Sequence, residues 1–291
     1  MATDTTVIIV TFRSKSIIEE CLDSFSGYPV IIVDNNSGDG IEELIRSKYP
    51  KVTFIQTGKN LGYGRANNIG LRACITKYGL IINPDIFIKA KQIKELEKIA
   101  NKHKNAAMVS PYFVNPEWDL SNHTTDLGDS SIGEVQQDIY SVAWVTGCAI
   151  LCDIAKLKKV GLFDENIFMF CEEHDLCNRV REQNYKILQS TNILVPHAPG
   201  MSSAPSTKIT YLRSWHWAWS RLYLRQKNKG TFKTIYSYPK FYGSYLKGFL
   251  KAVFTLNRLA IIENLAKMSG TLNHMLGFKA FDENDNPRGL F

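Results

Sequence analysis

Short apolar runs alternate with amphipathic stretches along the first 160 residues. The runs cover residues 6–12, 30–33 and 79–82, and such runs are typical of strands buried on both faces of a sheet. Residues 52–56 predict a further strand. Between these segments, apolar residues at helical spacing predict helices at 17–25, 41–48 and 65–78. Strands that alternate with helices predict βαβ units, and therefore an α/β fold with a mostly parallel central sheet flanked by helices.

The second half of the chain is less regular. We expect helices at 91–102, 154–160 and 172–183, strands at 106–110 and 142–151, and short extended pieces at 186–189 and 193–195. Residues 112–140 lack periodicity and predict an irregular insertion, whereas 282–291 has the composition of a disordered tail. The predicted organisation is an α/β domain over 1–205, a helical extension over 206–275 and a tail over 276–291.

Composition is that of an ordinary globular protein. The 291 residues are 44% hydrophobic and 22% charged. The N-terminus lacks the features of a signal peptide and no window approaches 18 uninterrupted apolar residues, so we expect a cytoplasmic location. Six cysteines without a paired C-x-x-C spacing predict reduced packing residues.

The net charge of +7 conceals an asymmetry. Residues 208–258 hold eleven Lys or Arg, no Asp or Glu, and thirteen aromatic residues, so the remainder carries 7 − 11 = −4. This composition predicts a helix pair on an anionic membrane surface, at the inner face of the cell membrane. The alternative is a helical subdomain whose aromatics pack inward. A nucleic-acid-binding protein is disfavoured because no recognition motif is present and three acidic candidates described below would repel phosphates.

The run 79–86 ends abruptly at Asn83-Pro84-Asp85. Pro84 cannot donate a ladder hydrogen bond, so the strand must end there and Asp85 lies at the edge of the sheet. Ligands of open α/β sheets bind at the carboxyl ends of strands, where a carboxylate suits a divalent cation that carries a diphosphate. The alternative is that Asp85 only caps the next helix.

Two further segments follow predicted strands. Asp34 lies at the end of the strand 30–33, where its carboxylate can accept a hydrogen bond from a base or ribose, or simply form an Asx turn. Residues 58–65 hold three glycines and then Arg65 at a helix start, which suits phosphate oxygens but equally suits a flexible loop.

The acidic cluster at 172–175 opens a predicted helix. Glu173 shares a face with Leu176, Cys177 and Val180, which places its carboxylate at the edge of an apolar stripe. A partly desolvated carboxylate can serve as a general base, although acidic residues also favour helix N-termini. His197 follows a short strand, and a neutral imidazole there suits a second ligand of a Mg²⁺ or Mn²⁺ ion held by Asp85.

Taken in order, these motifs resemble the family 2 glycosyltransferases of GT-A fold, particularly bacterial rhamnosyltransferases. The resemblance covers residues 6–205 and is carried by the segments 6–12, 32–37, 60–68, 82–85, 145–148, 161–165, 168–177 and His197.

The resemblance implies a role for each matching residue. Asp85 and His197 would hold Mg²⁺ or Mn²⁺, and Glu173 would be the general base, with Glu172 and Asp175 as alternatives. The acceptor side would comprise Trp144, Gly147 and Cys148. The nucleotide donor would be bound by Thr11, Phe12, Arg13, Asp34, Asn35, Asn60, Gly62, Arg65 and Asn83. Two positions depart from the family pattern: Asn83 replaces the first Asp of Asp-x-Asp, and Glu173 replaces the usual Asp.

The implied activity is inverting transfer of a sugar, L-rhamnose from dTDP-L-rhamnose, to a hydroxyl of a growing glycan on a polyprenyl-diphosphate lipid. Another dTDP- or UDP-sugar as donor, and a non-catalytic sugar-nucleotide-binding module, remain alternatives. The sequence does not determine the oligomeric state.

Overall fold

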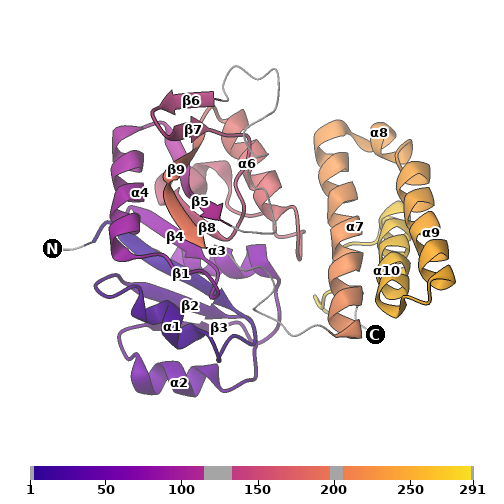
Figure 1. Cartoon of the computed structure of the whole chain (residues 1–291), viewed down its shortest axis with the longest axis horizontal. Coiled ribbons are helices and arrows are strands. Elements are labelled where there is room, and N and C mark those ends of the chain that lie inside the picture. Colours follow the sequence, from indigo (N-terminus) through magenta and orange to yellow (C-terminus); the bar gives the residue numbers. More distant parts are fainter. Residues whose placement is uncertain (1–2, 115–132, 197–205, 290–291) are drawn as a thin grey trace. The chain divides into compact units, whose positions relative to one another are not determined.

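The computed structural model describes residues 3–114, 133–196 and 206–289 (Figure 1). The chain divides into two compact units. The first, here the sheet unit, comprises Met1–Asn60, Arg65–Phe163 and Glu173–Ser203. The second, here the helical unit, comprises Leu61–Gly64, Asp164–Glu172 and Ala204–Phe291.

The strands form one sheet of mixed pairing, in the order β3-β2-β1-β4-β8-β5-β9-β7-β6. The first four strands in this order are parallel, as the alternating pattern predicts. Beyond them β8 pairs antiparallel with both β4 and β5, while β5 and β9 are parallel. The strands are β1 (Thr5–Thr11), β2 (Val30–Asp34), β3 (Thr53–Gln56), β4 (Tyr78–Ile82), β5 (Ala106–Val114), β6 (Gly133–Gln136), β7 (Ile139–Ser141), β8 (Ala149–Asp153) and β9 (Lys186–Pro196).

Helices cover both faces of this sheet. Alternate residues of the central strands, such as Val7, Ile9 and Leu80, pack against α1 (Ile18–Asp23), α2 (Ile41–Lys48) and α4 (Ala90–Lys102). The opposite face, including Ile31 and Val33, packs against α3 (Tyr63–Ala73). Figure 1 shows α4 and α6 (Glu172–Glu182) on opposite sides of the sheet. The α/β prediction is therefore confirmed, because strands buried on both faces require helices on both.

Two predicted extended segments differ from the structure. Only the last part of the predicted strand 142–151 is a strand, because ladder pairing with β4 begins at Ala149, opposite Ile82. Residues 142–148 form a loop before it. The two short pieces at 186–195 are instead one strand, β9, whose pairing with β5 shifts register between Pro111 and Tyr112.

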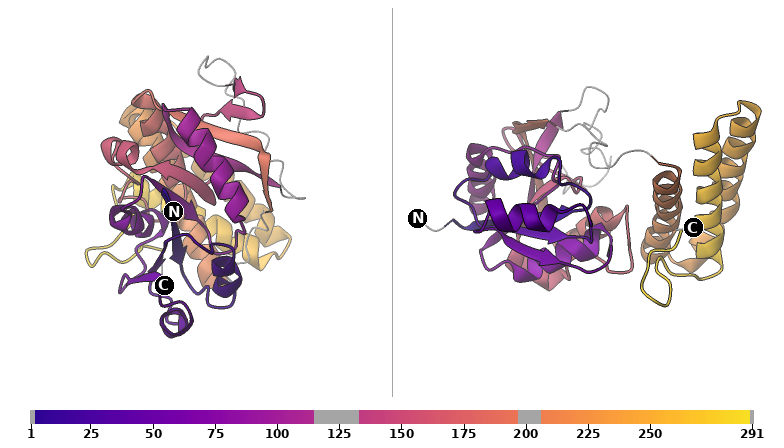
Figure 2. Two further views of the ribbon diagram at one scale, coloured as in Figure 1. Left: turned by 90° about the vertical axis from the view of Figure 1, so that its left-hand side faces the viewer. Right: turned by 90° about the horizontal axis from the view of Figure 1, so that it is seen from below.

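The helical unit holds α7 (Thr207–Lys229), α8 (Thr231–Ile235), α9 (Tyr238–Phe254) and α10 (Arg258–Met275). Figure 2 shows α9 and α10 running side by side, coloured from orange to yellow. Helix α10 also packs against α7. The aromatics of α7 form the core of the unit: Trp215 and Trp219 are 2% and 3% exposed and stack with 6.4 Å between ring centroids. None of the described helices combines the length and apolar character that crossing a bilayer requires.

The prediction of a disordered tail is wrong for residues 282–289. Phe281 forms an isolated bridge with Pro287, and the Arg288 amide donates to the Ala280 carbonyl at 2.8 Å. Gly289 lies against the Trp215 ring, where an added Cβ would be 3.0 Å from Cγ. The polar composition misled the prediction because these residues are fixed by backbone hydrogen bonds and by one buried ring.

Candidate active site

The candidate site lies at the carboxyl edge of the parallel strands. Thr11 and Asp34 are the last residues of β1 and β2 and are register partners. Asp85 follows β4, the other neighbour of β1, by three residues and is half-buried. Strand β4 ends at Ile82, before Pro84, as expected from the missing amide hydrogen.

Asp34 is fully buried and organises the turn after β2. Its Oδ1 accepts from the hydroxyls of Thr11, at 2.9 Å, and Ser37. Its Oδ2 accepts from the Ser37 amide at 2.9 Å and from Gln56 Nε2 at 3.0 Å. Four donors fill the lone pairs that a carboxylate offers. Ser37 and Gln56 were not predicted as partners of Asp34. The only feature of the sequence that could have indicated them is that each lies near the end of a strand.

The turn after β1 is joined to the same network. Arg13 adopts a left-handed backbone, with φ of 57°, and its amide donates to the Ser37 hydroxyl at 2.8 Å. Its guanidinium lies 5.4 Å from the ring centre of Phe12. Asn35 is buried, and its backbone N–H donates to the Thr11 carbonyl at 2.8 Å. Beside this turn is an open cavity of about 710 Å³, lined by Arg13, Lys15, Ser16, Glu19, Ser37, Gly38, Asp39 and Leu44.

Cys148 feels the charges of both Asp85 and Glu173. The Asn83 amide donates to the Cys148 carbonyl at 2.9 Å, which holds the Gly147–Cys148 turn against the end of β4. Burial raises the pKa of the Cys148 thiol to about 11, the Thr146 hydrogen bond opposes this, and the negative charges of Asp85 and Glu173 add to it. Both carboxylates are therefore electrostatic neighbours of one thiol, although 88 residues separate them in the sequence.

Helix α6 presents Glu173 as predicted. Leu176, Cys177 and Val180 on its face are fully buried, while the Glu173 side chain is 20% exposed. Burial raises the pKa of the Glu173 carboxyl above its ordinary 4.5, and a backbone hydrogen bond only partly opposes this. A carboxylate with a raised pKa is a better proton acceptor.

The loop before β8 packs on the same helix. The Trp144 and His174 rings lie 4.2 Å apart between centroids. Burial lowers the pKa of His174, so its imidazole is neutral at pH 7. Its Nδ1 lies 3.8 Å from Glu173 Oε1. The three predicted acceptor-side residues, Trp144, Gly147 and Cys148, thus belong to a loop that contacts the helix of the candidate base.

The two alternative bases have different surroundings. Asp175 is 1% exposed and accepts from Arg179 Nε at 2.8 Å. The same guanidinium donates to the carbonyl of Val160, the last residue of α5 (Ile154–Val160), and to those of Gly161 and Leu162 after it. Asp175 thus holds two segments together through Arg179, which disfavours a role in proton transfer. Glu172 is buried and belongs to the helical unit.

Asn68 belongs to the segment 60–68 that carries the family resemblance, but no role was predicted for it. It is fully buried in α3, its Nδ2 donates to the Phe163 carbonyl at 2.9 Å, and its Oδ1 accepts from the Phe163 amide at 2.9 Å. This paired bond fixes α3 to the turn after α5. Asn60 and Arg65 precede and follow the glycine loop in the sequence. Both belong to the sheet unit, and both are half-buried.

Gly62 belongs to the helical unit, where it meets the segment that precedes Glu173. A Cβ on Gly62 would lie 2.1 Å from the Phe168 carbonyl oxygen, and its φ is +82°. The Tyr63 amide donates to the same oxygen at 3.1 Å. Gly62 was predicted as a nucleotide contact; in the structure, close packing on Phe168 is sufficient to require a glycine.

The segment Asp164–Glu172 is held by α7. The Ser220 hydroxyl donates to the Met169 carbonyl at 2.8 Å, and Tyr223 donates to Asp164 Oδ2 at 3.0 Å. Burial alone would raise the pKa of Asp164, but hydrogen bonds from Lys227 and Asn166 outweigh it and lower the pKa to about 2. Phe170 and Cys171 have φ of 67° and 68°, a strained conformation for residues with side chains. The chain passes through this strained step directly into α6.

The described residues suit a metal ion only if the sugar-nucleotide donor supplies some of its ligands. They contain no group of three or more His, Cys, Asp or Glu side chains able to hold an ion. Asp85 supplies a carboxylate, and the predicted second ligand, His197, lies outside the described residues. Mg²⁺ is typically bound by one or two protein carboxylates, and phosphate oxygens and water complete its coordination shell. The donor set therefore suits a cation shared with a diphosphate. The six cysteines, all of which lie within the described residues, form no disulfide.

The family model described as "Glycosyl transferase family 2" matches residues 6–161, which is more than half of the chain. The chain therefore belongs to this family of glycosyltransferases. The matched residues include the strand ends that carry Thr11, Asp34 and Asp85, and they end before α6.

Curated relatives are similar at low identity. The N-acetylglucosaminyl-diphospho-decaprenol L-rhamnosyltransferase of Mycobacterium tuberculosis is 25% identical over 276 residues, covering 77% of this chain and 89% of the relative. The low-salt glycan biosynthesis hexosyltransferase Agl10 of Haloferax volcanii is 28% identical over 203 residues, covering 65% of each chain. The rhamnosyltransferase WbbL of Escherichia coli is 24% identical, covering 60% of this chain and 75% of the relative.

Solved structures establish the GT-A fold. A mannosyltransferase of Pyrobaculum calidifontis, in complex with GDP-Man and Mn²⁺, superposes with a TM-score of 0.60 at 15% identity, covering 95% of this chain and 88% of that chain. TarS 1–349 of S. aureus, in complex with UDP-GlcNAc, superposes with a TM-score of 0.55 at 15% identity, covering 96% and 93%. At these identities the likeness concerns the fold alone.

Proposed function

We propose that this protein is an inverting glycosyltransferase that moves L-rhamnose from dTDP-L-rhamnose to a hydroxyl of a lipid-linked glycan. The observation that carries the proposal is the position of Asp85 just after β4 at the carboxyl edge of the sheet. The Asn83 amide holds Cys148 beside this strand end, and the negative charges of Asp85 and Glu173 both act on the Cys148 thiol. Two of the relatives named above are rhamnosyltransferases, and one carries a diphospho-decaprenol acceptor in its name. These names support the choice of sugar and acceptor.

Glu173 acts as the general base in this proposal. Its raised pKa and partial exposure suit proton removal from an acceptor hydroxyl. The deprotonated oxygen attacks the anomeric carbon, the bond from that carbon to the diphosphate breaks, and the configuration inverts in a single displacement. The loop of Trp144, Gly147 and Cys148, which contacts α6 through His174, borders the acceptor.

The donor occupies the edge formed by β2, β1 and β4. Asp34 fixes Ser37 and Thr11, so it shapes the site for the base and ribose through the turn 35–39 rather than through a free oxygen. Arg65 and Asn60 flank the glycine loop on the diphosphate side. Asp85 and His197 would hold a Mg²⁺ or Mn²⁺ ion, which would supply positive charge to offset the leaving diphosphate.

Transfer of radiolabelled rhamnose to decaprenyl-diphosphate-linked N-acetylglucosamine tests this proposal. Glu173→Gln should lower kcat by about 10²–10⁴-fold, the usual contribution of a general base, and leave dTDP affinity unchanged. Asp85→Ala should abolish the metal-stimulated activity. Glu182→Gln, at the exposed end of the same helix, is the matched control and should behave as wild type.

Different failures have different meanings. Undiminished turnover of Glu173→Gln would move the role of base to another residue. Transfer from UDP-sugars but not from dTDP-rhamnose would correct the donor. If dTDP binds but neither transfer nor donor hydrolysis occurs with metal, the protein is a sugar-nucleotide-binding module.

A further inference from the structure

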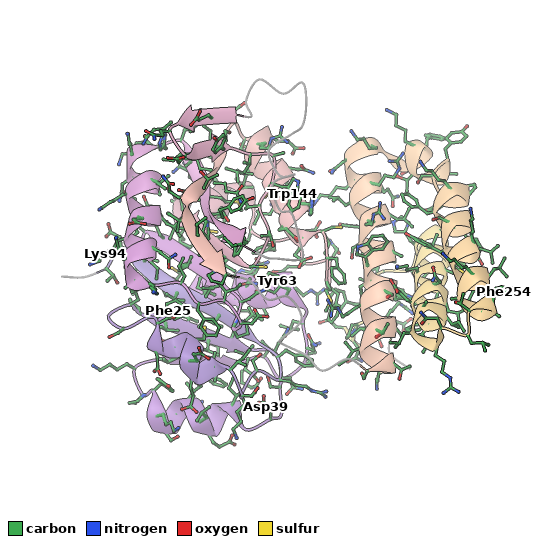
Figure 3. All side chains as sticks on the ribbon, in the orientation of Figure 1. Phe25, Asp39, Tyr63, Lys94, Trp144 and Phe254 are labelled. Atoms are coloured by element: carbon green, nitrogen blue, oxygen red, sulfur yellow. The ribbon has the colours of Figure 1, made fainter. Side chains whose placement is uncertain are left out.

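Helix α9 exposes a row of apolar side chains. Leu246, Leu250, Val253 and Phe254 recur at i, i+4, i+7 and i+8, so they share one side of the helix. Leu250 is 58% exposed and Phe254 is 90% exposed, and Leu256, in the turn that follows, is 84% exposed. Figure 3 shows Phe254 at the outer edge of the α9–α10 pair. We call these five residues the α9 apolar surface.

The orientation of α9 is fixed from its other side. Tyr245 and Ala252 are buried, and Gly248 between them packs so closely on α10 that an added Cβ would lie 2.5 Å from Asn264 Oδ1. These inward residues are spaced i, i+3 and i+7, so the helix cannot turn its apolar surface inward without losing this packing. The exposure is therefore a property of the folded unit.

Basic residues border this surface. Lys240, Lys247 and Lys251 are exposed and form a neighbouring row on α9, and exposed Arg258 opens α10. From residue 208 to residue 258 the sequence has no acidic residue. An apolar row beside a basic row is the pattern of a helix that lies in the surface of an anionic bilayer.

The structure restricts this role to α9 and its neighbouring turn. Trp215, Trp219 and Tyr245 are packed inside the unit, so they cannot lie at the depth of lipid headgroups. Two cations contact the Trp217 ring: Arg221 Cζ lies 4.3 Å and Lys267 Nζ 5.1 Å from its centroid. The membrane interpretation placed the aromatics of 208–258 at headgroup depth, and for Trp215, Trp219 and Tyr245 it is wrong, because these rings pack inward as the alternative predicted.

We infer that the α9 apolar surface docks on an anionic lipid bilayer, with its apolar side chains among the acyl chains and its Lys and Arg residues on lipid phosphates. A second copy of the chain fits less well, because a symmetric contact would bring the same uncompensated cations together. Single-stranded nucleic acid would leave the aliphatic residues without partners. The inference goes beyond the proposed function, since docking requires neither donor nor acceptor.

Co-sedimentation with phosphatidylcholine vesicles containing 0–40% phosphatidylglycerol tests the inference on the full chain. Binding should rise with phosphatidylglycerol and fall with added salt. Lys247→Gln with Lys251→Gln should weaken partitioning by about 25-fold, given roughly fivefold for each cation near an anionic surface. Phe254→Ser should weaken it by about tenfold or more.

Matched controls come from the sheet unit. Lys94→Gln with Lys98→Gln removes an exposed i, i+4 lysine pair from α4, and Ile75→Ser removes an apolar side chain that is 97% exposed. Both controls should bind vesicles as wild type does, and circular dichroism should show all variants folded.

Three results would overturn the inference: no wild-type binding to anionic vesicles at low salt, equal losses in the α4 and α9 variants, or binding indifferent to Phe254→Ser. A dimer that dissociates on Phe254→Ser, without an effect on vesicles, would assign the surface to a second copy. Tight binding of single-stranded DNA without vesicle binding would assign it to nucleic acid. Because these assays contain no donor, their failure would leave the proposed transferase activity intact.

Discussion

Glu173 combines a polar role with an apolar position. The apolar residues on its face of α6 are fully buried, yet its own carboxyl is partly exposed beside neutral His174. Burial penalises the charged form, so the protein stabilises the protonated acid relative to the unfolded chain. The property that suits Glu173 to accept a proton therefore costs folding free energy whenever it is ionised.

This cost predicts a pH-dependent effect of Glu173→Gln on stability. Between the ordinary pKa of 4.5 and the raised folded value, the folded state binds more protons than the unfolded state, so this group makes stability fall as pH rises. Glutamine does not titrate. Urea unfolding should therefore find Glu173→Gln more stable than wild type at pH 8, with the difference vanishing by pH 4.

Glu182→Gln is the control for this measurement, because Glu182 ends the same helix in an exposed position. It should change stability little at either pH. A stability difference for Glu173→Gln that is equal at pH 4 and pH 8 would show that the carboxyl is not penalised by burial, and would weaken its assignment as the base.

Several elements follow from the sequence because local signals and tertiary partners agree. The predicted helix 41–48 has the bounds of α2, and β4 ends where Pro84 requires. The predicted helix 65–78 ends instead at Ala73, because Tyr78 pairs with Thr5 as the first residue of β4. An aromatic residue such as Tyr78 suits a helix or a strand, and only its pairing with Thr5 shows that it belongs to β4.

The site was predictable to a similar extent. Residues at strand ends, such as Asp34 and Asp85, follow from the rule that places ligands there. The neighbours of these residues do not follow from such a rule: Cys148 lies beside the end of β4 only because β8 runs antiparallel to β4, a pairing that no local pattern indicates. The link between α7 and the segment before Glu173 is equally non-local, since Ser220 and Met169 are 51 residues apart.

The loop before α3 and the segment before α6 form a close contact that a matched pair of glycines can test. Gly62 and Gly58 both have positive φ, +82° and +75°, but only Gly62 faces a backbone oxygen. Gly58→Ala should cost about 1 kcal/mol of unfolding free energy for the left-handed backbone alone. Gly62→Ala should cost about 1–3 kcal/mol more, because Phe168 must move. Urea unfolding measures both, and equal losses would show that the segment accommodates a methyl group.

The arrangement of charge separates the two functions proposed for this chain. The segment 208–258 carries +11, and the remainder of the chain carries −4, which includes the carboxylates of the candidate site. An anionic donor approaching such a site requires a cation to offset Asp85 and Glu173, whereas the basic segment needs an anionic surface rather than a small ligand. Metal should therefore couple to nucleotide binding and salt to vesicle binding.

Thermal unfolding with a panel of nucleoside diphosphates tests the first coupling. A ligand at 100 times its Kd stabilises the folded state by about 2.7 kcal/mol, which for a unit of roughly 200 residues raises Tm by about 5 °C or more. We expect this shift with dTDP and Mn²⁺ together, and a much smaller shift with dTDP in EDTA. UDP and GDP in the same panel report which base the site at β1 and β2 accepts.

Asp85→Ala distinguishes a metal site from a general effect of Mn²⁺ on the protein. The variant should keep the small shift seen in EDTA and lose the increment from Mn²⁺, because the nucleotide still meets the β1–β2 edge while the shared cation has lost its carboxylate. Glu173→Gln should retain the full shift, since a base that acts on the acceptor has no part in holding the diphosphate. A Mn²⁺ increment that survives in Asp85→Ala would place the cation elsewhere and remove the carboxylate after β4 from the proposed mechanism.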